Sequence, residues 1–216
     1  MEPLAGTFLE KNNMKDLKTI LRQHAEDVHR RGRGSADLSE MDLRAELLMR
    51  MDLRDADMRG CDLRGANLSD SSFWRAKFCY ADLFEASLSR TNLGCADFYY
   101  ARLAFASLRN ADLNDAKMVC ADCTSAVLNN SSLQRATLRG TNLYRATLRA
   151  CDLRECDLRG TNLTFADMRE CNLHGADLRG ANLYRADLRE CDLRGAKIAK
   201  SNIGEAHLCD VTKKML

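Results

Sequence analysis

The chain of 216 residues contains almost no proline, since Pro3 is the only one. Because proline removes a backbone N–H donor, its absence elsewhere suits a chain that pairs its backbone in ladders. The sequence also lacks a run of about 18 apolar residues, which argues against a membrane-spanning helix. Its start, with Glu2, Pro3 and Glu10, lacks a basic segment followed by an apolar one, so we expect no secretory signal.

The net charge is also small, and catalytic motifs are scarce. The 33 Lys and Arg residues face 31 Asp and Glu residues, which leaves a formal net charge of +2. The four histidines are scattered, and no Gly-rich phosphate loop or nucleophile elbow appears. We therefore expect one domain with no catalytic residues and no cofactor, and thus no enzyme.

What the chain does have is a period of five. Every fifth residue from Leu38 to Leu208 is large and apolar, over 35 consecutive positions of which 26 are Leu. We call this residue the centre of its repeat. The residue two positions before the centre is small, except for Met41, Glu46 and Met51. This period fits neither a helix nor a simple strand.

The spacing within one repeat predicts which residues are buried. In an extended backbone the centre and the small residue point the same way, because they lie two residues apart. Asp or Asn precedes the centre in 22 of the 35 repeats, and Arg is the commonest residue after it. Units this short cannot bury an apolar face alone, so they must stack on copies of themselves. The pattern predicts a tightly filled Leu and Ala core with a polar exterior and no catalytic pocket.

Individual repeats match a known pattern. Ala66-Asn67-Leu68-Ser69-Asp70 and Ala186-Asp187-Leu188-Arg189-Glu190 resemble the pentapeptide-repeat family, whose repeat is A(D/N)LXX. The resemblance covers roughly residues 36–210. It implies an all-β solenoid, namely a right-handed, quadrilateral (four-sided) parallel β-helix of about nine coils. We divide the chain into an N-terminal segment (1–34), the repeat domain (35–210) and a C-terminal tail (211–216).

The N-terminal segment predicts an amphipathic helix over about residues 13–30. Asn12 or Asn13 can cap its start, and Gly32 or Gly34 can end it. We expect this α-helical cap to cover the first coil, which otherwise exposes unpaired strand edges. A partner-binding or membrane-surface helix is the alternative. The stripe at helical spacing consists of Leu17, Ile20, Leu21, Ala25 and Val28.

The ten cysteines do not predict a disulfide framework. Five occupy the small interior position, where Cys acts as a compact hydrophobe, and a reducing cytoplasm is the expected compartment. Cys120 and Cys123 form a C-x-x-C pair, but Cys123 is a centre and Cys120 points outward, so we expect no metal. The five interior cysteines are Cys61, Cys151, Cys156, Cys171 and Cys191.

The outer surface should carry the function. Sorting repeats by four concentrates exposed aromatics on two neighbouring sides of the middle coils, and exposed aromatic patches are typical of interfaces. Stabilisation of the sheet by cross-strand aromatic contacts is the alternative. The candidate protein-binding residues are Tyr80, Phe84, Tyr99, Tyr100 and Phe105.

Arginine ladders mark the C-terminal half. Arg139, Arg159 and Arg179 recur on one side, and Arg149, Arg169 and Arg189 recur on another. Nucleic-acid binding needs clustered, uncompensated cations, whereas acidic residues share both sides. We therefore expect neutralised charge lattices and no direct nucleic-acid binding.

Three functional classes remain. The first is a non-enzymatic scaffold that presents its sides to a protein partner. The second is a DNA-mimic inhibitor or protector of DNA gyrase or topoisomerase, because quinolone-resistance proteins look like this fold. The third is a purely structural rod in a larger assembly. The family resemblance also allows a homodimer through the C-terminal coils.

The core assignment is testable at Leu103, a centre in the middle of the rod. Leu103→Asp should abolish folding, because it buries an unpaired charge at a cost of several kcal/mol, on the order of 3 or more. Circular dichroism and thermal melting measure the outcome. A retained β signal with a cooperative melt would contradict the core assignment.

Overall fold

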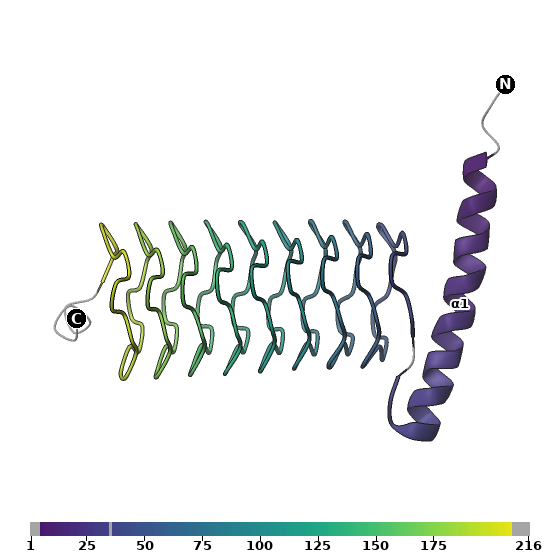
Figure 1. Cartoon of the computed structure of the whole chain (residues 1–216), viewed down its shortest axis with the longest axis horizontal. Helices are drawn as coiled ribbons and strands as arrows, with labels where there is room; N and C mark the ends of the chain where they lie inside the picture. Colours follow the sequence, from purple (N-terminus) through teal and green to yellow (C-terminus); the bar gives the residue numbers. More distant parts are fainter. Residues whose placement is uncertain (1–4, 35, 209–216) are drawn as a thin grey trace.

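The computed structural model describes residues 5–34 and 36–208 in two parts, a helix and a rod. Helix α1 (Ala5–Arg31) lies across the N-terminal end of the rod (Figure 1). The described rod contains no strand longer than one bridged residue, so its β structure consists of isolated parallel bridges. The predicted solenoid and N-terminal helix are therefore confirmed, with bridges in place of regular strands.

The bridges fix the register of the rod. Each joins a residue to the one 20 positions later, as Asp37 joins Asp57, and successive bridges start five residues apart. The residue before each centre makes the bridge, so we call it the bridge residue, and the two after the centre are the turn residues. Four columns of repeats result: column 1 contains Asp37, column 2 Asp42, column 3 Leu47 and column 4 Asp52.

Each repeat ends in a tight turn. The N–H of the small residue donates to the carbonyl of the preceding centre, as from Ala76 to Phe73 at 2.9 Å. The second turn residue has a positive φ in every repeat from Glu40 to Glu205, between 53° and 71°. A turn closed over four residues can require this left-handed conformation at its third residue. Only seven of these positions are glycine, so the strain of the others is offset by the ladder that surrounds them.

The Asp or Asn bridge residues complete the backbone hydrogen bonding. Three further N–H groups of a repeat donate to carbonyls of neighbouring coils, as Leu83, Glu85 and Asp82 do. The N–H of the first turn residue is left over. In all 22 repeats with Asp or Asn at the bridge, its side-chain oxygen accepts this N–H at 3.0–3.4 Å. The residue thus has a structural role as well as a polar one.

The interior is apolar and closely filled. The centres from Leu53 to Leu178 are 0% exposed, and most small residues are buried beside them. In the core, Phe78 stacks on Phe98 with ring centroids 4.9 Å apart and meets Phe73 edgewise at 5.4 Å. The rod and Leu17 of α1 belong to one hydrophobic cluster.

The interior thiols do more than fill space. The nine described cysteines are free. Each of the five at the small position donates to the carbonyl of a centre 23 residues earlier, at 2.7–3.0 Å. Buried Ser71, Thr141 and Thr161 do the same, so these positions select for short donors. Burial raises the pKa of Cys61 and of Cys156 to about 12, which makes these thiols unreactive.

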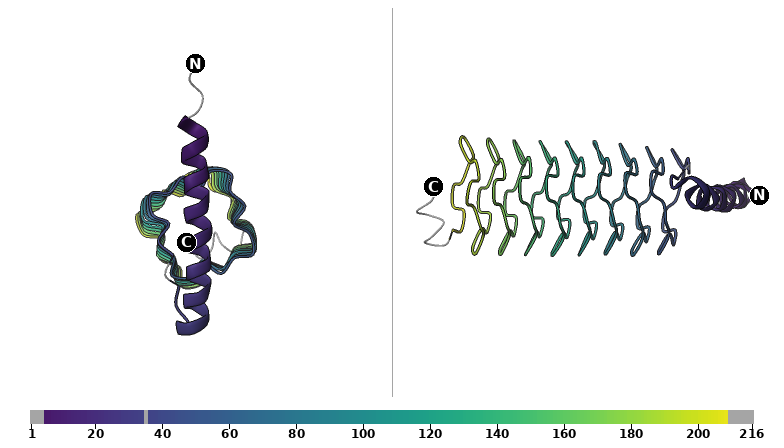
Figure 2. Two further views of the ribbon diagram at one scale, coloured as in Figure 1. Left: turned by 90° about the vertical axis from the view of Figure 1, so that its right-hand side faces the viewer. Right: turned by 90° about the horizontal axis from the view of Figure 1, so that it is seen from below.

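Helix α1 covers the first coil through its C-terminal half. Leu17 is buried, and Ile20 and Leu21 pack against the core cluster. His24 is buried as well, and its Nδ1 accepts the N–H of Ala36 at 2.9 Å. Seen along the rod, α1 crosses the open end of the coil and extends past its edge (Figure 2).

The helix begins earlier than its capping signals indicate. Asn12 and Asn13, predicted as N-caps, lie inside α1, so that prediction was wrong. Gly32 ends the helix as predicted, with φ of 67° and an N–H that donates to Val28. Gly34 is needed for close approach, because a Cβ there would clash with the His24 ring and the Arg54 carbonyl. The predicted tail, 211–216, lies outside the described residues.

Substitutions at Asp177 can distinguish the stability that comes from capping the turn from the stability that comes from the ion pair. It accepts the N–H of Arg179 and also binds its guanidinium. We expect Asp177→Ala to lower the free energy of unfolding by about 1 kcal/mol, and Asp177→Asn by less than half of that, because Asn keeps the turn acceptor. Urea denaturation measures both.

The control for this comparison is Asn172→Ala. Asn172 caps the N–H of His174, so no arginine pairs with it within the repeat. The cost should match that of Asp177→Ala. Equal losses for Asp177→Asn and Asp177→Ala would instead assign the stability to the ion pair.

His24 makes docking of α1 sensitive to pH. Burial lowers the pKa of His24 below its ordinary 6.5, against the opposing effect of Asp52, Asp27 and Asp55. The undocked state therefore binds the proton more tightly, so docking is fully stable above pH 6.5 and weakens as the pH falls from there through the lower folded pKa. Once the intrinsic pH dependence of amide exchange is divided out, the protection factors of residues 17–31 should be lower at about pH 5 than at about pH 7.5. In His24→Gln this difference should vanish, and a difference of unchanged size would exclude His24 as its source.

Candidate protein-binding surface

Three of the predicted surface residues form one cluster on column 1. The Tyr80 and Tyr100 rings stack with centroids 5.8 Å apart and an interplanar angle of 10°. Tyr99 meets both edgewise, with its centroid 4.6 Å from Tyr100 and 5.8 Å from Tyr80. A hydrogen bond with Cys120 raises the pKa of Tyr100, so this phenol stays protonated near neutral pH. We call Tyr80, Tyr99 and Tyr100 the tyrosine cluster.

The other two predicted residues form a pair on column 2. Phe84 and Phe105 meet edgewise, with centroids 5.6 Å apart. Along the chain, an ion pair separates this phenylalanine pair from the tyrosine cluster, since Arg102 Nη1 donates to Asp82 Oδ2 at 2.8 Å. The structure thus brings the five residues together as two groups, and among the described residues no ring contact joins them.

These aromatics project into solvent from the turns. Tyr80, Tyr100 and Phe105 are second turn residues, with φ of 61°, 53° and 60°. Bulky side chains rarely adopt this conformation, and column 1 has glycine at the same position in Gly60, Gly140, Gly160 and Gly180. The backbone therefore does not require an aromatic residue there. The exposed fractions are 63% for Tyr80, 53% for Phe105, 48% for Tyr100 and 39% for Tyr99.

A second aromatic ladder lies further along column 2. Phe165 meets Tyr144 and Tyr184 edgewise, at 5.9 and 6.1 Å. The Arg145 and Arg185 guanidinium groups each lie 5.8 Å from the Phe165 ring centroid, on which they act as cation–π partners. The sequence analysis missed these arginines as part of the ladder. Their spacing of 20 residues around Phe165 places them in its turn column and could have indicated the contact.

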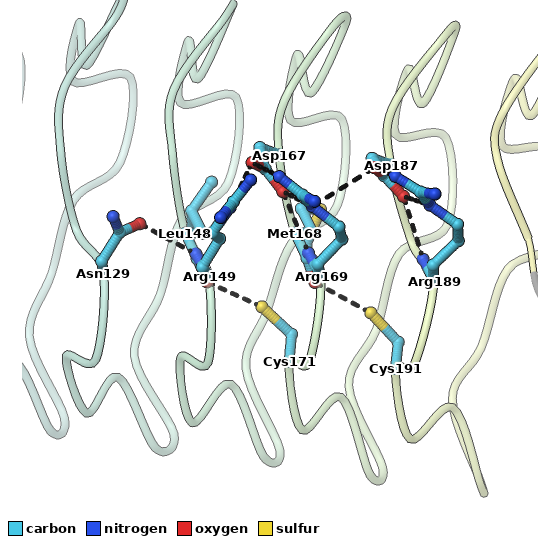
Figure 3. A network of polar contacts seen from close by, with 10 residues as sticks. All are labelled: Asn129, Leu148, Arg149, Asp167, Met168, Arg169, Cys171, Asp187, Arg189 and Cys191. Carbon is cyan, nitrogen blue, oxygen red and sulfur yellow. Dashed lines mark hydrogen bonds and ion pairs between the residues drawn. The ribbon is translucent and has the colours of Figure 1, made fainter.

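The Asp and Arg residues form a regular lattice. In ten repeats the Arg after the centre binds the Asp before it through two hydrogen bonds of 2.5–2.9 Å. Contacts along the column link neighbouring pairs, as Arg149 Nε does with Asp167 at 2.6 Å and Arg169 Nε with Asp187 at 3.4 Å (Figure 3). Hydrogen bonds from Arg179 and Arg194 lower the pKa of Asp177 and of Asp192 to about 2.

The remaining titratable groups are dispersed. His24 is a buried residue of α1 itself, whereas His174 and His207 are exposed on columns 4 and 3. Cys123 is buried and Cys120 half-buried. In the part of the chain that the structure describes, no three His, Cys, Asp or Glu side chains are placed to hold a metal ion. None of the described helices has the length and apolar character to cross a membrane.

Comparison with known proteins agrees with the geometry. Overlapping segments that together span residues 35–212 match the family model described as pentapeptide repeats, in eight copies. A search of curated proteins finds no match.

Two solved structures illustrate the likeness. HetL, a pentapeptide repeat protein involved in heterocyst differentiation regulation from the cyanobacterium Nostoc sp. strain PCC 7120, is 28% identical, with a TM-score of 0.69 over 85% of this chain and 92% of HetL. A trypsin-treated variant of QnrB1, a plasmid-mediated fluoroquinolone resistance protein, is 18% identical, with a TM-score of 0.56 over 83% of this chain and 90% of that one. At this lower identity the likeness to QnrB1 concerns the fold alone.

Proposed function

The chain belongs to the pentapeptide-repeat family, and we propose that it is a non-enzymatic scaffold whose rigid rod presents its middle coils to a protein partner. The observation that carries the proposal is the tyrosine cluster with the neighbouring phenylalanine pair. Three of them, Tyr80, Tyr100 and Phe105, are exposed at second turn positions that the same columns elsewhere fill with glycine.

The composition of this surface fits a protein partner. Aromatic side chains are enriched in the cores of protein interfaces, because they bury a large area while losing few rotamers. The tyrosine hydroxyls and the Arg102–Asp82 pair supply polar contacts beside the apolar rings. A partner that covers both groups would bury aromatic area around one ion pair.

Rigidity supports the same proposal. The tyrosine cluster follows the buried centres Phe78 and Phe98, whose rings stack 4.9 Å apart in the core. Surface rings attached to such a backbone lose little freedom on binding, which favours affinity.

The finer shape of the rod is part of this proposal. Bridges between residues 20 apart, starting every five residues, support a four-sided helix of about nine coils, and membership of the pentapeptide-repeat family supports its right-handed sense. We also place the protein in the cytoplasm, in keeping with its free thiols. A homodimer through the C-terminal coils remains part of the proposal to be tested by light scattering.

The likeness to HetL supports a binding role, since that protein is involved in regulation and matches over most of both chains. The gyrase alternative has less support. In ten repeats an arginine neutralises the aspartate, whereas a DNA mimic needs a continuous acidic surface.

An affinity capture experiment tests the proposal. The intact rod is compared with Tyr99→Ser/Tyr100→Ser/Phe105→Ser as bait in lysate of the source organism. We expect one or more proteins to be captured by the intact rod and lost, by about tenfold or more, with the variant, because its surface lacks the main aromatic anchors.

The matched control is Tyr144→Ser/Phe165→Ser/Tyr184→Ser, which removes three aromatics from the second ladder. It should capture the same proteins as the intact rod. Equal capture by all baits would refute the proposed surface. Capture of gyrase would support the topoisomerase alternative, and co-sedimentation with a polymer would support the structural rod.

A further inference from the structure

A basic groove lies near the far end of column 1. Its volume is about 470 Å³, and Arg159, Arg179, Gly180, Ala199 and Lys200 line it. It belongs to later coils than the tyrosine cluster, which spans residues 80–100. The groove is therefore a separate site from the proposed protein-binding surface.

Glycine at the turns opens the groove. Gly160 and Gly180 are second turn residues of consecutive coils in column 1. A Cβ built on Gly160 would meet no atom within 4 Å, and one on Gly180 would meet only the Gly160 nitrogen at 4.0 Å. The space above these two turns is thus empty, although the fold could accommodate side chains there.

The groove carries excess positive charge. Lys200 lines the groove and Lys197 is the bridge residue of the same repeat; both are exposed and form no ion pair with any described residue. Arg159 and Arg179 bind Asp157 and Asp177 through Nε and Nη2, which leaves three N–H groups on each guanidinium for another acceptor. The carboxylates of Asp157 and Asp177 repel an anion, but each is already paired with its own arginine.

Column 3 has the same arginine pairs as the groove but lacks its glycine turns. Arg169 and Arg189 bind Asp167 and Asp187 with the same geometry as Arg159 and Arg179 bind their partners. Glu170 and Glu190 occupy the turn positions where column 1 has glycine, so the space is filled and acidic. The arginine pairs alone therefore do not distinguish the groove.

The charge asymmetry extends to the whole C-terminal half. Between residues 137 and 205, the repeats of columns 1 and 2 carry seven Lys or Arg and three Asp or Glu side chains. Over the same range, the repeats of columns 3 and 4 carry five and seven. An anion approaching the rod is thus directed toward the side that holds the groove.

We propose that this groove binds a small anion with two or more phosphate groups. Its cations lie in three successive coils, separated by about 4.8 Å per coil, so a single phosphate contacts fewer of them than a chain of phosphates does. Arginine forks and lysine ammonium groups are the usual protein donors to phosphate oxygens. The glycine turns give the anion access to the groove without a steric barrier.

Isothermal titration calorimetry with sodium tripolyphosphate at low ionic strength tests the proposal. We expect one site per chain, and binding about tenfold weaker for inorganic phosphate, because fewer cations are engaged. Lys197→Gln/Lys200→Gln and Arg159→Gln/Arg179→Gln should each weaken tripolyphosphate binding at least about fivefold. Arg169→Gln/Arg189→Gln, which changes the net charge of the rod by the same amount, should leave it within about twofold.

A second pair of variants tests the groove without changing charge. Gly160→Asn/Gly180→Asn should abolish binding by filling the groove. The turn tolerates Asn, since Asn110 and Asn130 occupy it with φ of 56° and 60°. Gly175→Asn/Gly195→Asn, at the corresponding turns of column 4, should bind as the unmodified chain does.

Three results would overturn the proposal. The first is the absence of binding heat for the unmodified chain at millimolar tripolyphosphate. The second is an equal loss from the column 1 and column 3 arginine variants, which would indicate attraction to net charge alone. The third is unchanged binding by Gly160→Asn/Gly180→Asn. None of these results bears on the aromatic surface, so the two proposals fail independently.

Discussion

The fold depends on finding an acceptor for every backbone N–H of a five-residue unit that is too short for a helix or a regular strand. Four of the five donate to backbone carbonyls, one within the turn and three between coils. The fifth, on the first turn residue, has no backbone acceptor, and in the 22 repeats with Asp or Asn at the bridge position that side chain accepts it. An unpaired buried N–H costs about 1–3 kcal/mol, and the cap removes this cost in most repeats. Where it is present, the Asp or Asn therefore completes the backbone hydrogen bonding as well as adding a polar group to the surface.

This hydrogen-bonding pattern distinguishes the positions of the repeat that determine the fold from those whose residue type can vary. The centre, the small residue and the bridge residue satisfy the core and the ladder. The two turn residues point outward, and the backbone restricts them only by the left-handed conformation of the second. The surface can therefore hold a tyrosine cluster in the middle coils and a glycine-floored groove in later coils of the same column. Differences in function can accumulate at the turns while the rod stays the same.

The period of five was sufficient to predict the core, because every centre is apolar and the residue two positions before it is small in all but the three repeats of Met41, Glu46 and Met51. Leu103 and the other centres from Leu38 to Leu193 are buried as expected, whereas Ile203 near the end of the described rod is 36% exposed. The sides on which Tyr80, Tyr100 and Phe105 lie also followed from counting, since a period of 20 places them in columns. The contact between Phe84 and Phe105 is the kind of neighbour relation that such counting can anticipate.

Other features depend on geometry that the sequence pattern does not display. The helix start was wrong because Asn12 and Asn13 have capping side chains yet lie within a longer helix. Hydrogen bonds from Cys171 and Cys191 to carbonyls were missed because Cys was treated only as a small hydrophobe. The groove was missed because the period identifies glycine as a turn residue, whereas its importance here lies in the space that it leaves free.

The bridges between residues 20 apart also determine how the rod responds to force. Every interior coil is held on both sides, whereas a terminal coil is held on one side only, and α1 gives the first coil additional contacts through Leu17 and His24. Because each coil contacts only its neighbours, unravelling one leaves the next intact and newly terminal. Under tension, the described rod should therefore lengthen in discrete steps of one coil, and it should yield first at the end opposite α1.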